Sequence, residues 1–435
     1  MNRLRITLND GRRFVYPAAM AAVLVLLAGG ANALAYGVHC VPKLSVNASC
    51  TDYYTTISAA VTAASSGDII VVGPGKYNES VTINTDSLSL FGAQAGNDAR
   101  VGRQNQAKES IVDGTGTAKS TIVINAPFVA IDGFTVQGGT VGALAGGIYL
   151  TGADAYGAEV LNNIIQNNSN GVCPMGSSEL VIEHNLFRNN NVGTGSYVGY
   201  GIYAYDAGTL GITDNEFTGN QAAAVYVDTC EFVVITNNSS CKDGAFVSIL
   251  STSNLDFSHN QGINFGAKPL LGLADAAVSI GYGNQNLAIS DNSLEEGEGS
   301  ISHGVAFTTA FGTSADSEGV VVKNNTIVGF KGNGIVAETD TTVSPTLGMT
   351  RYSSIVGNEV RDNGLDGISI KGADVYNTNI SLFDNEAEGN HVFDCQDTST
   401  GTGYTLGTHN TWFNNIGNLS SPRGLCTPGR GHYHD

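Results

Sequence analysis

The chain has 435 residues and a formal net charge of −19, with 56 glycines, 9 prolines and only 14% charged residues. Its hydrophobic content of 42% predicts a folded protein and excludes a disordered one. The acidic balance argues against nucleic acid as a partner, and it disfavours polyanionic substrates unless a cation mediates their binding.

Residues 1–35 are predicted to be an export signal peptide. An apolar run over 18–27 follows an arginine-rich start, and Ala33-Leu34-Ala35 fits the small-x-small rule for cleavage. Cleavage would leave no stable membrane span and, because this segment holds four arginines and one aspartate, a net charge of −22. The alternative is a retained anchor, since 17–35 is almost long enough to cross a bilayer. We expect a secreted, periplasmic or cell-surface protein.

Residues 36–66 are predicted to form an N-terminal cap that contains one short helix. The stretch 56–64 places four small apolar residues on one helical face: Ile57, Ala60, Val61 and Ala64. Such a face can cover the open end of a repeat protein, whose core and strand edges would otherwise meet water.

A short sequence motif, in which an apolar strand ends in asparagine, recurs through residues 67–395. Successive motifs lie 22 to 33 residues apart, a spacing typical of a solenoid. We expect stacked asparagine side chains to hydrogen-bond from coil to coil, and the turns to need a left-handed residue that asparagine tolerates. The shortest interval is one coil, and longer intervals hold loops. The asparagines are Asn163, Asn185, Asn215, Asn238, Asn260, Asn292, Asn325, Asn358 and Asn385.

Helical periodicity is almost absent from this region, which excludes α/β folds with crossover helices. The prediction is an all-β protein, a single-stranded parallel β-helix of about 10–12 coils, closed by a C-terminal capping segment at 396–435.

Several segments are typical of a known family: 54–61 (YTTISAAV), 67–77 (GDIIVVGPGKY), 129–135 (VAIDGFT) and the cysteine-flanked ending over 394–426. They resemble secreted right-handed β-helix proteins of the pectin-lyase-like superfamily, among them uncharacterised members. The resemblance implies a right-handed coil and says much less about activity.

Aromatic residues recur on the outward side of the strands that precede the asparagines. Coils are stacked about 4.8 Å apart, so outward rings of successive coils would form a strip on which sugar rings could stack. The alternative is ordinary cross-strand packing under a rim loop. The candidate substrate-binding residues are Tyr149, Tyr203, Tyr205, Tyr226 and Phe246.

Asp206 and Asp228 are the candidate catalytic residues, because they lie on adjacent coils and hydrolysis of a glycoside needs two carboxylates. In pectate lyases, which the fold resembles, this face carries calcium-binding carboxylates and a basic residue. Here the outward columns hold no arginine, and Lys371 lies six coils from Tyr203, so a lyase of that kind is poorly supported. No cofactor is identified, calcium has no motif, and His184 and His259 are expected to be exposed turn residues rather than metal ligands.

Seven cysteines remain after the predicted cleavage, and pairing is the default in an exported protein. Proximity along the chain predicts the disulfides Cys40–Cys50, Cys230–Cys241 and Cys395–Cys426, with Cys173 left free.

These observations favour an exported β-helix that binds or processes polysaccharide. The alternatives are a non-catalytic structural or adhesin-like β-helix of the cell surface, and a polysaccharide lyase or glycoside hydrolase with an atypical site.

Overall fold

The computed structural model describes residues 5–7, 13–15, 36–42, 50–116, 120–141, 145–193, 197–266, 275–308, 316–338, 350–371, 377–402 and 404–429. The predicted signal peptide lies outside this part of the chain, apart from the antiparallel pair β1 (Arg5–Thr7) and β2 (Arg13–Val15).

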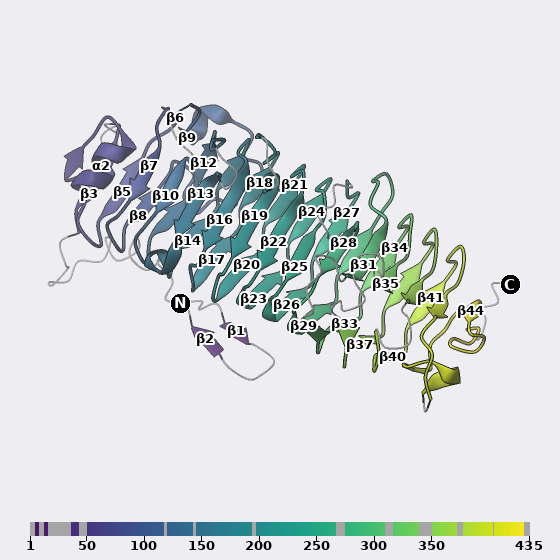
Figure 1. Cartoon of the computed structure of the whole chain (residues 1–435). Coiled ribbons are helices and arrows are strands. Elements are labelled where there is room, and N and C mark those ends of the chain that lie inside the picture. The colour runs from purple at the N-terminus through teal and green to yellow at the C-terminus, as the bar shows by residue number, and fades with distance from the viewer. Residues whose placement is uncertain are drawn as a thin grey trace.

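The chain winds into an elongated stack of coils, coloured from purple to yellow in Figure 1. Three parallel sheets run along the stack, and each coil adds a short strand to each sheet in turn. In the part of the chain that the structure describes, two of the sheets have 13 and 12 strands, which places the coil number at or just above the upper end of the predicted range of about 10–12. The prediction of a single-stranded parallel β-helix is confirmed.

The 13-stranded sheet consists of β7 (Val81–Ile83), β10 (Ile122–Ile124), β13 (Gly146–Thr151), β16 (Asn170–Met175), β19 (Tyr200–Tyr205), β22 (Ala223–Asp228), β25 (Val247–Leu250), β28 (Ala276–Ile280), β31 (His303–Thr308), β35 (Ile335–Glu338), β39 (Ile368–Ile370), β42 (Cys395–Asp397) and β44 (Ser420–Ser421). The 12-stranded sheet consists of β6 (Gly75–Tyr77), β9 (Ser110–Asp113), β12 (Phe134–Gln137), β15 (Ile164–Gln166), β18 (Leu186–Arg188), β21 (Glu216–Thr218), β24 (Ser239–Cys241), β27 (Gln261–Ile263), β30 (Ser293–Glu295), β34 (Thr326–Val328), β38 (Glu359–Arg361) and β41 (Glu386–Glu388).

The third sheet consists of β4 (Asp52–Tyr53), β3 (Val38–Val41), β5 (Ile69–Val72), β8 (Ser89–Phe91), β11 (Ala130–Asp132), β14 (Glu159–Leu161), β17 (Leu180–Glu183), β20 (Leu210–Thr213), β23 (Glu231–Thr236), β26 (Ser253–Ser258), β29 (Gln285–Ser290), β32 (Ser317–Glu318), β33 (Val321–Lys323), β36 (Thr350–Arg351), β37 (Ser354–Val356), β40 (Ser381–Phe383) and β43 (Thr411–Phe413). Among the described residues, three short 3-10 helices lie between strands: η1 (Gln106–Lys108), η2 (Gly152–Ala155) and η3 (Thr405–Gly407).

The core consists of inward side chains that stack in register from coil to coil. Alternate residues of a strand point to opposite faces, so one apolar residue per strand repeats at the same place in every coil. In the 13-stranded sheet one such fully buried column is Val172, Ile202, Val225, Val247, Val278 and Val305.

The predicted asparagine ladder is confirmed at the turn between the third sheet and the 12-stranded sheet. The backbone N–H and the Nδ2 of Asn215 donate to Oδ1 of Asn238, at 2.9 and 3.1 Å, and Nδ2 also donates to the Ile182 carbonyl at 2.8 Å. These bonds satisfy turn amides that are buried away from water. The left-handed residue is the one before the ladder asparagine, such as Asp214 with a φ of 53°.

Helix α2 (Ile57–Ala63) closes the N-terminal end of the stack, as predicted. Thr56 caps it by accepting the Ala59 N–H, and the Glu79 carboxylate accepts the N–H groups of Ile57 and Ser58, both at 2.9 Å. Its buried residues are Ile57, Ala60 and Val61. Strand β3, which precedes the helix, already pairs with β5.

Two of the three predicted disulfides are present, Cys40–Cys50 and Cys395–Cys426. The predicted bond between Cys230 and Cys241 is wrong, because both residues are free, as is Cys173. The six-residue strand β23 separates the two and spans about 20 Å, so they lie at different corners of the coil. A disulfide needs Cα atoms within about 7 Å.

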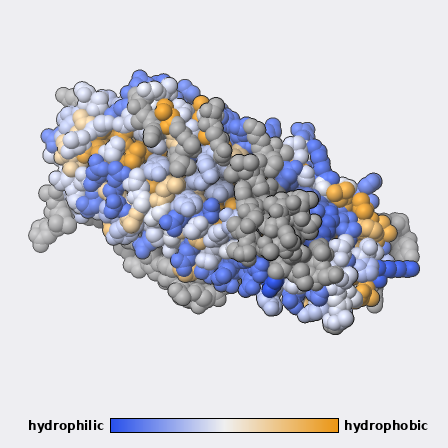
Figure 2. Space-filling view, viewed as in Figure 1, coloured by the Kyte–Doolittle hydropathy of each residue, from blue (hydrophilic) through white to orange (hydrophobic). Residues whose placement is uncertain are grey.

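The face drawn in Figure 2 is largely hydrophilic, and hydrophobic residues gather towards the two ends of the rod. Among the described residues, no helix has the length and apolar character needed to cross a membrane.

Candidate functional site

The outer face of the 13-stranded sheet carries the predicted aromatic column. Tyr149, Cys173 and Tyr203 follow one another on successive coils, and Tyr203 then pairs with Tyr226 and Tyr226 with Ser248. All five side chains alternate with inward residues, so they point away from the core. The predicted orientation of the three tyrosines is therefore correct.

Tyr203 and Tyr226 form the centre of a tyrosine cluster. Their rings are stacked, with centroids 4.8 Å apart and an interplanar angle of 2°. Tyr200 packs against both, at 5.3 and 5.2 Å, and Tyr197 meets Tyr203 edge-on at 5.9 Å. Only 4% of Tyr203 and 5% of Tyr226 is exposed, so this buried pair packs under the neighbouring rings and does not itself offer an open surface for stacking.

The accessible rings lie around this buried pair. Tyr197 is 44% exposed and Tyr205 is 42% exposed, whereas Tyr149 and Tyr282 are half-buried. Tyr205 pairs in register with Asp228 on the next coil. Exposed aromatic faces next to a carboxylate suit a sugar, whose ring has apolar C–H faces and a polar rim.

Asp228 is half-buried among hydroxyl groups. The Tyr226 hydroxyl donates to its Oδ2 at 3.2 Å, and the Thr229 hydroxyl donates to its Oδ1 at 3.0 Å. Burial raises the pKa of Asp228, and these two hydrogen bonds oppose part of the rise. Burial and then the Asp228 charge raise the pKa of Tyr203 and of Tyr226, so both phenols stay neutral.

Asp206 occupies a different place in the coil from Asp228. It is exposed in a turn, with a φ of 54°, and its backbone N–H donates to the Asp228 carbonyl at 3.0 Å. Because Tyr205 aligns with Asp228, Asp206 aligns with Thr229. The two candidate catalytic carboxylates thus belong to separate columns, one at a strand end and one in the turn.

The predicted place of Phe246 in the aromatic strip is wrong. The residue is fully buried and packs on Phe257 and Phe265, at 5.1 and 6.3 Å between ring centroids. Ser248 takes the position beside Tyr226 instead. The coil that contains β25 is shifted by two residues relative to the predicted alignment.

Sequence reasoning missed Tyr197, Tyr200 and Tyr282 as members of the cluster. Tyr200 precedes the predicted outward positions of its strand, and Tyr197 lies in the loop before it. Tyr282 follows β28, and charge from Asp228 and Tyr205 contributes to the raised pKa of its phenol, after the larger effect of burial. The run of tyrosines at 197, 200, 203 and 205 was the available signal.

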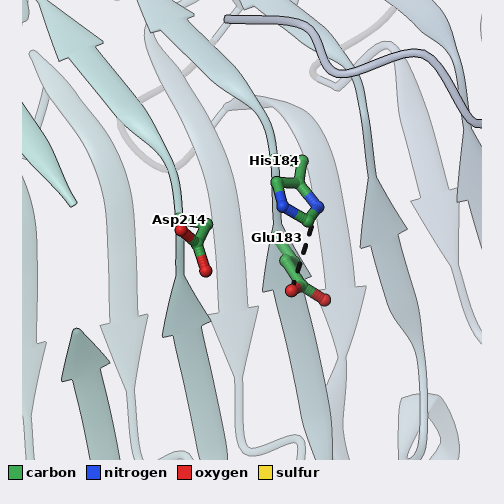
Figure 3. A group of neighbouring side chains, drawn as sticks. All are labelled: Glu183, His184 and Asp214. Atoms are coloured by element: carbon green, nitrogen blue, oxygen red, sulfur yellow. Dashed lines mark ion pairs between the residues drawn. The ribbon is translucent and has the colours of Figure 1, made fainter. Parts of the chain in front are cut away.

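A second group of polar residues lies at the ladder turn beside the third sheet (Figure 3). Glu183, His184 and Asp214 each offer one ligand atom, and these atoms lie within 4.8 Å of one another. His184 is a left-handed turn residue, with a φ of 56°. Burial raises the pKa of Glu183; the His184 charge opposes this rise, and Asp214 adds to it.

The comparisons with known proteins concern the whole solenoid. A family model described as "Right handed beta helix region" matches residues 120–294 and 198–347, which together span more than half of the chain. A cell surface glycoprotein of Methanothermus fervidus is 34% identical over 116 residues, which are 26% of this chain and only 16% of that protein's length.

The chain is also similar to solved structures at low sequence identity. A mannuronic acid specific polysaccharide family 6 lyase from human gut microbiota superposes with a TM-score of 0.56 and 11% identity, over 84% of this chain and 86% of that one. An alginate lyase from Paenibacillus sp. str. FPU-7 gives a TM-score of 0.43 and 14% identity, over 72% of this chain and 94% of that one. At 11% identity the first likeness shows the fold alone.

Proposed function

The chain belongs to the right-handed β-helix family, and from that premise we propose that it binds a polysaccharide outside the cell or at its surface. The observation that carries the proposal is the tyrosine cluster on the 13-stranded sheet, where exposed Tyr197 and Tyr205 flank a stacked, buried pair. The two disulfides and the cell-surface relative fit such a location.

The proposed ligand is a neutral polysaccharide. Sugar C–H faces would stack on Tyr205 and Tyr197, while Asp228 accepts hydrogen bonds from sugar hydroxyls. A chain of net charge −19 repels polyanions, so alginate and pectate are expected to bind more weakly than uncharged glucans, mannans or xylans.

The test is retention of the purified protein on a panel of neutral and anionic polysaccharides. Tyr205→Ala should weaken binding roughly tenfold, because a stacked ring contributes about 1.4 kcal/mol. Tyr352→Ala is the matched control, since Tyr352 is 65% exposed and lies at a turn of the third sheet. Equal loss in both variants, or none in Tyr205→Ala, would contradict the proposed site.

Catalysis is tested on the same panel by measuring reducing ends and unsaturated products. We expect binding without turnover, because hydrolysis needs a pair of suitably placed carboxylates, and Asp206 and Asp228 lie in separate columns. If the wild-type protein forms products, and Asp228→Asn abolishes product formation but retains binding, the site is instead an enzyme active site.

A structural role at the cell surface is the second candidate, favoured by the match to a cell surface glycoprotein. It predicts that neither the wild-type protein nor the Tyr205→Ala variant is retained on any polysaccharide of the panel.

A further inference from the structure

Two successive ladder turns bring Glu183, His184 and Asp214 together. Asn185 and Asn215 are consecutive rungs, since the Asn185 N–H donates to Oδ1 of Asn215 at 3.0 Å. The residues before them, His184 and Asp214, therefore lie side by side, and Glu183 ends the strand that leads into the first turn. Their side chains are 21%, 37% and 34% exposed for Glu183, His184 and Asp214, so a small ion can enter from solvent.

The charges of this group are only partly balanced by the side chains around it, because the Arg100 guanidinium is shared between Asp98 and Asp214. The Arg100 guanidinium pairs with both oxygens of Asp98 at 2.7 to 3.1 Å, and its distance to Asp214 is 3.6 Å. Within the described part of the chain, Nδ1 of His184 lies 3.8 Å from the Glu183 carboxylate. Because the Arg100 charge is shared with Asp98, the carboxylates of Glu183 and Asp214 leave a net negative charge that a divalent cation would neutralise.

Thr213 supplies an independent observation. It is 5% exposed, and its hydroxyl has no hydrogen-bond partner in the described structure, which is unfavourable for a buried polar group. Thr213 pairs in register with Glu183, immediately precedes Asp214, and directs its side chain to the same outer face of the third sheet. The unpartnered hydroxyl of Thr213 therefore lies on the same side of the sheet as the Glu183 carboxylate, in the neighbouring strand.

We propose that Glu183, His184 and Asp214 bind a first-row divalent cation of the Zn²⁺ type. The mixed nitrogen and oxygen ligands favour this class, because Ca²⁺ and Mg²⁺ take oxygen ligands. Three protein ligands leave a coordination position for water, which Thr213 can hydrogen-bond. The ion links two neighbouring coils beside the 92–109 segment, which is held to the same turn by the Ala99 N–H bond to the His184 carbonyl at 3.1 Å.

The test is Zn²⁺ binding by the full-length protein, measured by competition with a chromophoric chelator and by metal content after dialysis. The variants His184→Asn and Asp214→Asn place asparagine where Asn162, Asn237 and Asn324 already occupy the same left-handed turn position, so the fold is retained. Each should weaken Zn²⁺ binding by roughly tenfold or more. Zn²⁺ should also raise the Tm of the wild-type protein and not that of the variants.

His259→Asn is the matched control, because His259 occupies the equivalent turn position, with a φ of 56°, in another coil. It should bind one Zn²⁺ as the wild type does. The proposal is overturned if the wild type binds no Zn²⁺, if both His184→Asn and Asp214→Asn bind it unchanged, or if His259→Asn loses as much. Displacement of Zn²⁺ by an equal concentration of Ca²⁺ would overturn the assignment of the ion class.

Discussion

Asp243 is a buried carboxyl group in a row of asparagines, and its replacement by asparagine should stabilise the protein at neutral pH. A second ladder runs through Asn168, Asn190 and Asn220, and Asp243 takes the next rung. Its Oδ1 accepts the Asn220 N–H at 2.7 Å and Nδ2 at 2.8 Å, and its Oδ2 accepts the Ser240 hydroxyl at 2.7 Å.

Burial raises the pKa of Asp243 from 3.8 to about 7, although these hydrogen bonds favour the charged form. Between about pH 4 and pH 7, the folded protein therefore holds a proton that the unfolded chain has already released. By linkage, the contribution of this proton to the free energy of unfolding is complete below pH 3.8 and is lost as the pH rises through 7. About three pKa units at 1.36 kcal/mol each correspond to about 4 kcal/mol.

Asp243→Asn keeps the Oδ1 acceptor and replaces Oδ2 with an NH₂ group. This group can donate to Ser240, or to the Phe217 carbonyl, which aligns with the Phe187 carbonyl that Asn220 uses. Compared with the wild type, the variant should be more stable by up to about 4 kcal/mol at pH 8 and equally stable within about 1 kcal/mol at pH 4.

The assay is denaturant unfolding of both proteins from pH 4 to pH 8, where the difference between them isolates position 243 from other titrating groups. Asp206→Asn, the same chemical change at an exposed turn, should shift stability by less than about 0.5 kcal/mol throughout. A difference between Asp243→Asn and wild type that is independent of pH, or a variant that is less stable at pH 8, would refute the reasoning.

Two further predictions concern stability and thiols. Tyr226→Ala should lower the free energy of unfolding by about 3–5 kcal/mol, as for other large buried aromatics, whereas Tyr205→Ala should change it by less than about 1 kcal/mol. Similar values for the two variants in denaturant unfolding would contradict the difference in burial. Thiol titration of the denatured, unreduced protein should find three free thiols, those of Cys173, Cys230 and Cys241. A count of one would contradict the structure and indicate a disulfide between Cys230 and Cys241.

The repeat could be predicted from the sequence because its signals are local. Each ladder asparagine follows its own strand, and the alternation of apolar residues marks the inward face within a few positions. The helical face of Ile57, Ala60 and Val61 could be predicted for the same reason.

Positions that depend on neighbouring coils could not be predicted from the sequence in this way. Phe246 was misplaced because the loops between coils vary in length, so the two-residue shift at β25 is decided only when strands pair. Cys230 and Cys241 are close in sequence but lie at different corners, since a strand separates them. The burial of Tyr203 and Tyr226 depends on packing outside the sheet, which strand alternation does not report.

The sequence by itself determined the kind of solenoid, its cap and its ladder, because these follow from short periodic patterns that every coil repeats. Only the tertiary structure decided which outward side chains meet. The group formed by Glu183, His184 and Asp214 illustrates the reason, since Asp214 is 30 residues from His184 and becomes its neighbour through the hydrogen bond between Asn185 and Asn215. Stacking converts such distances along the chain into contacts across about 4.8 Å, and the loops between coils decide which residues are paired.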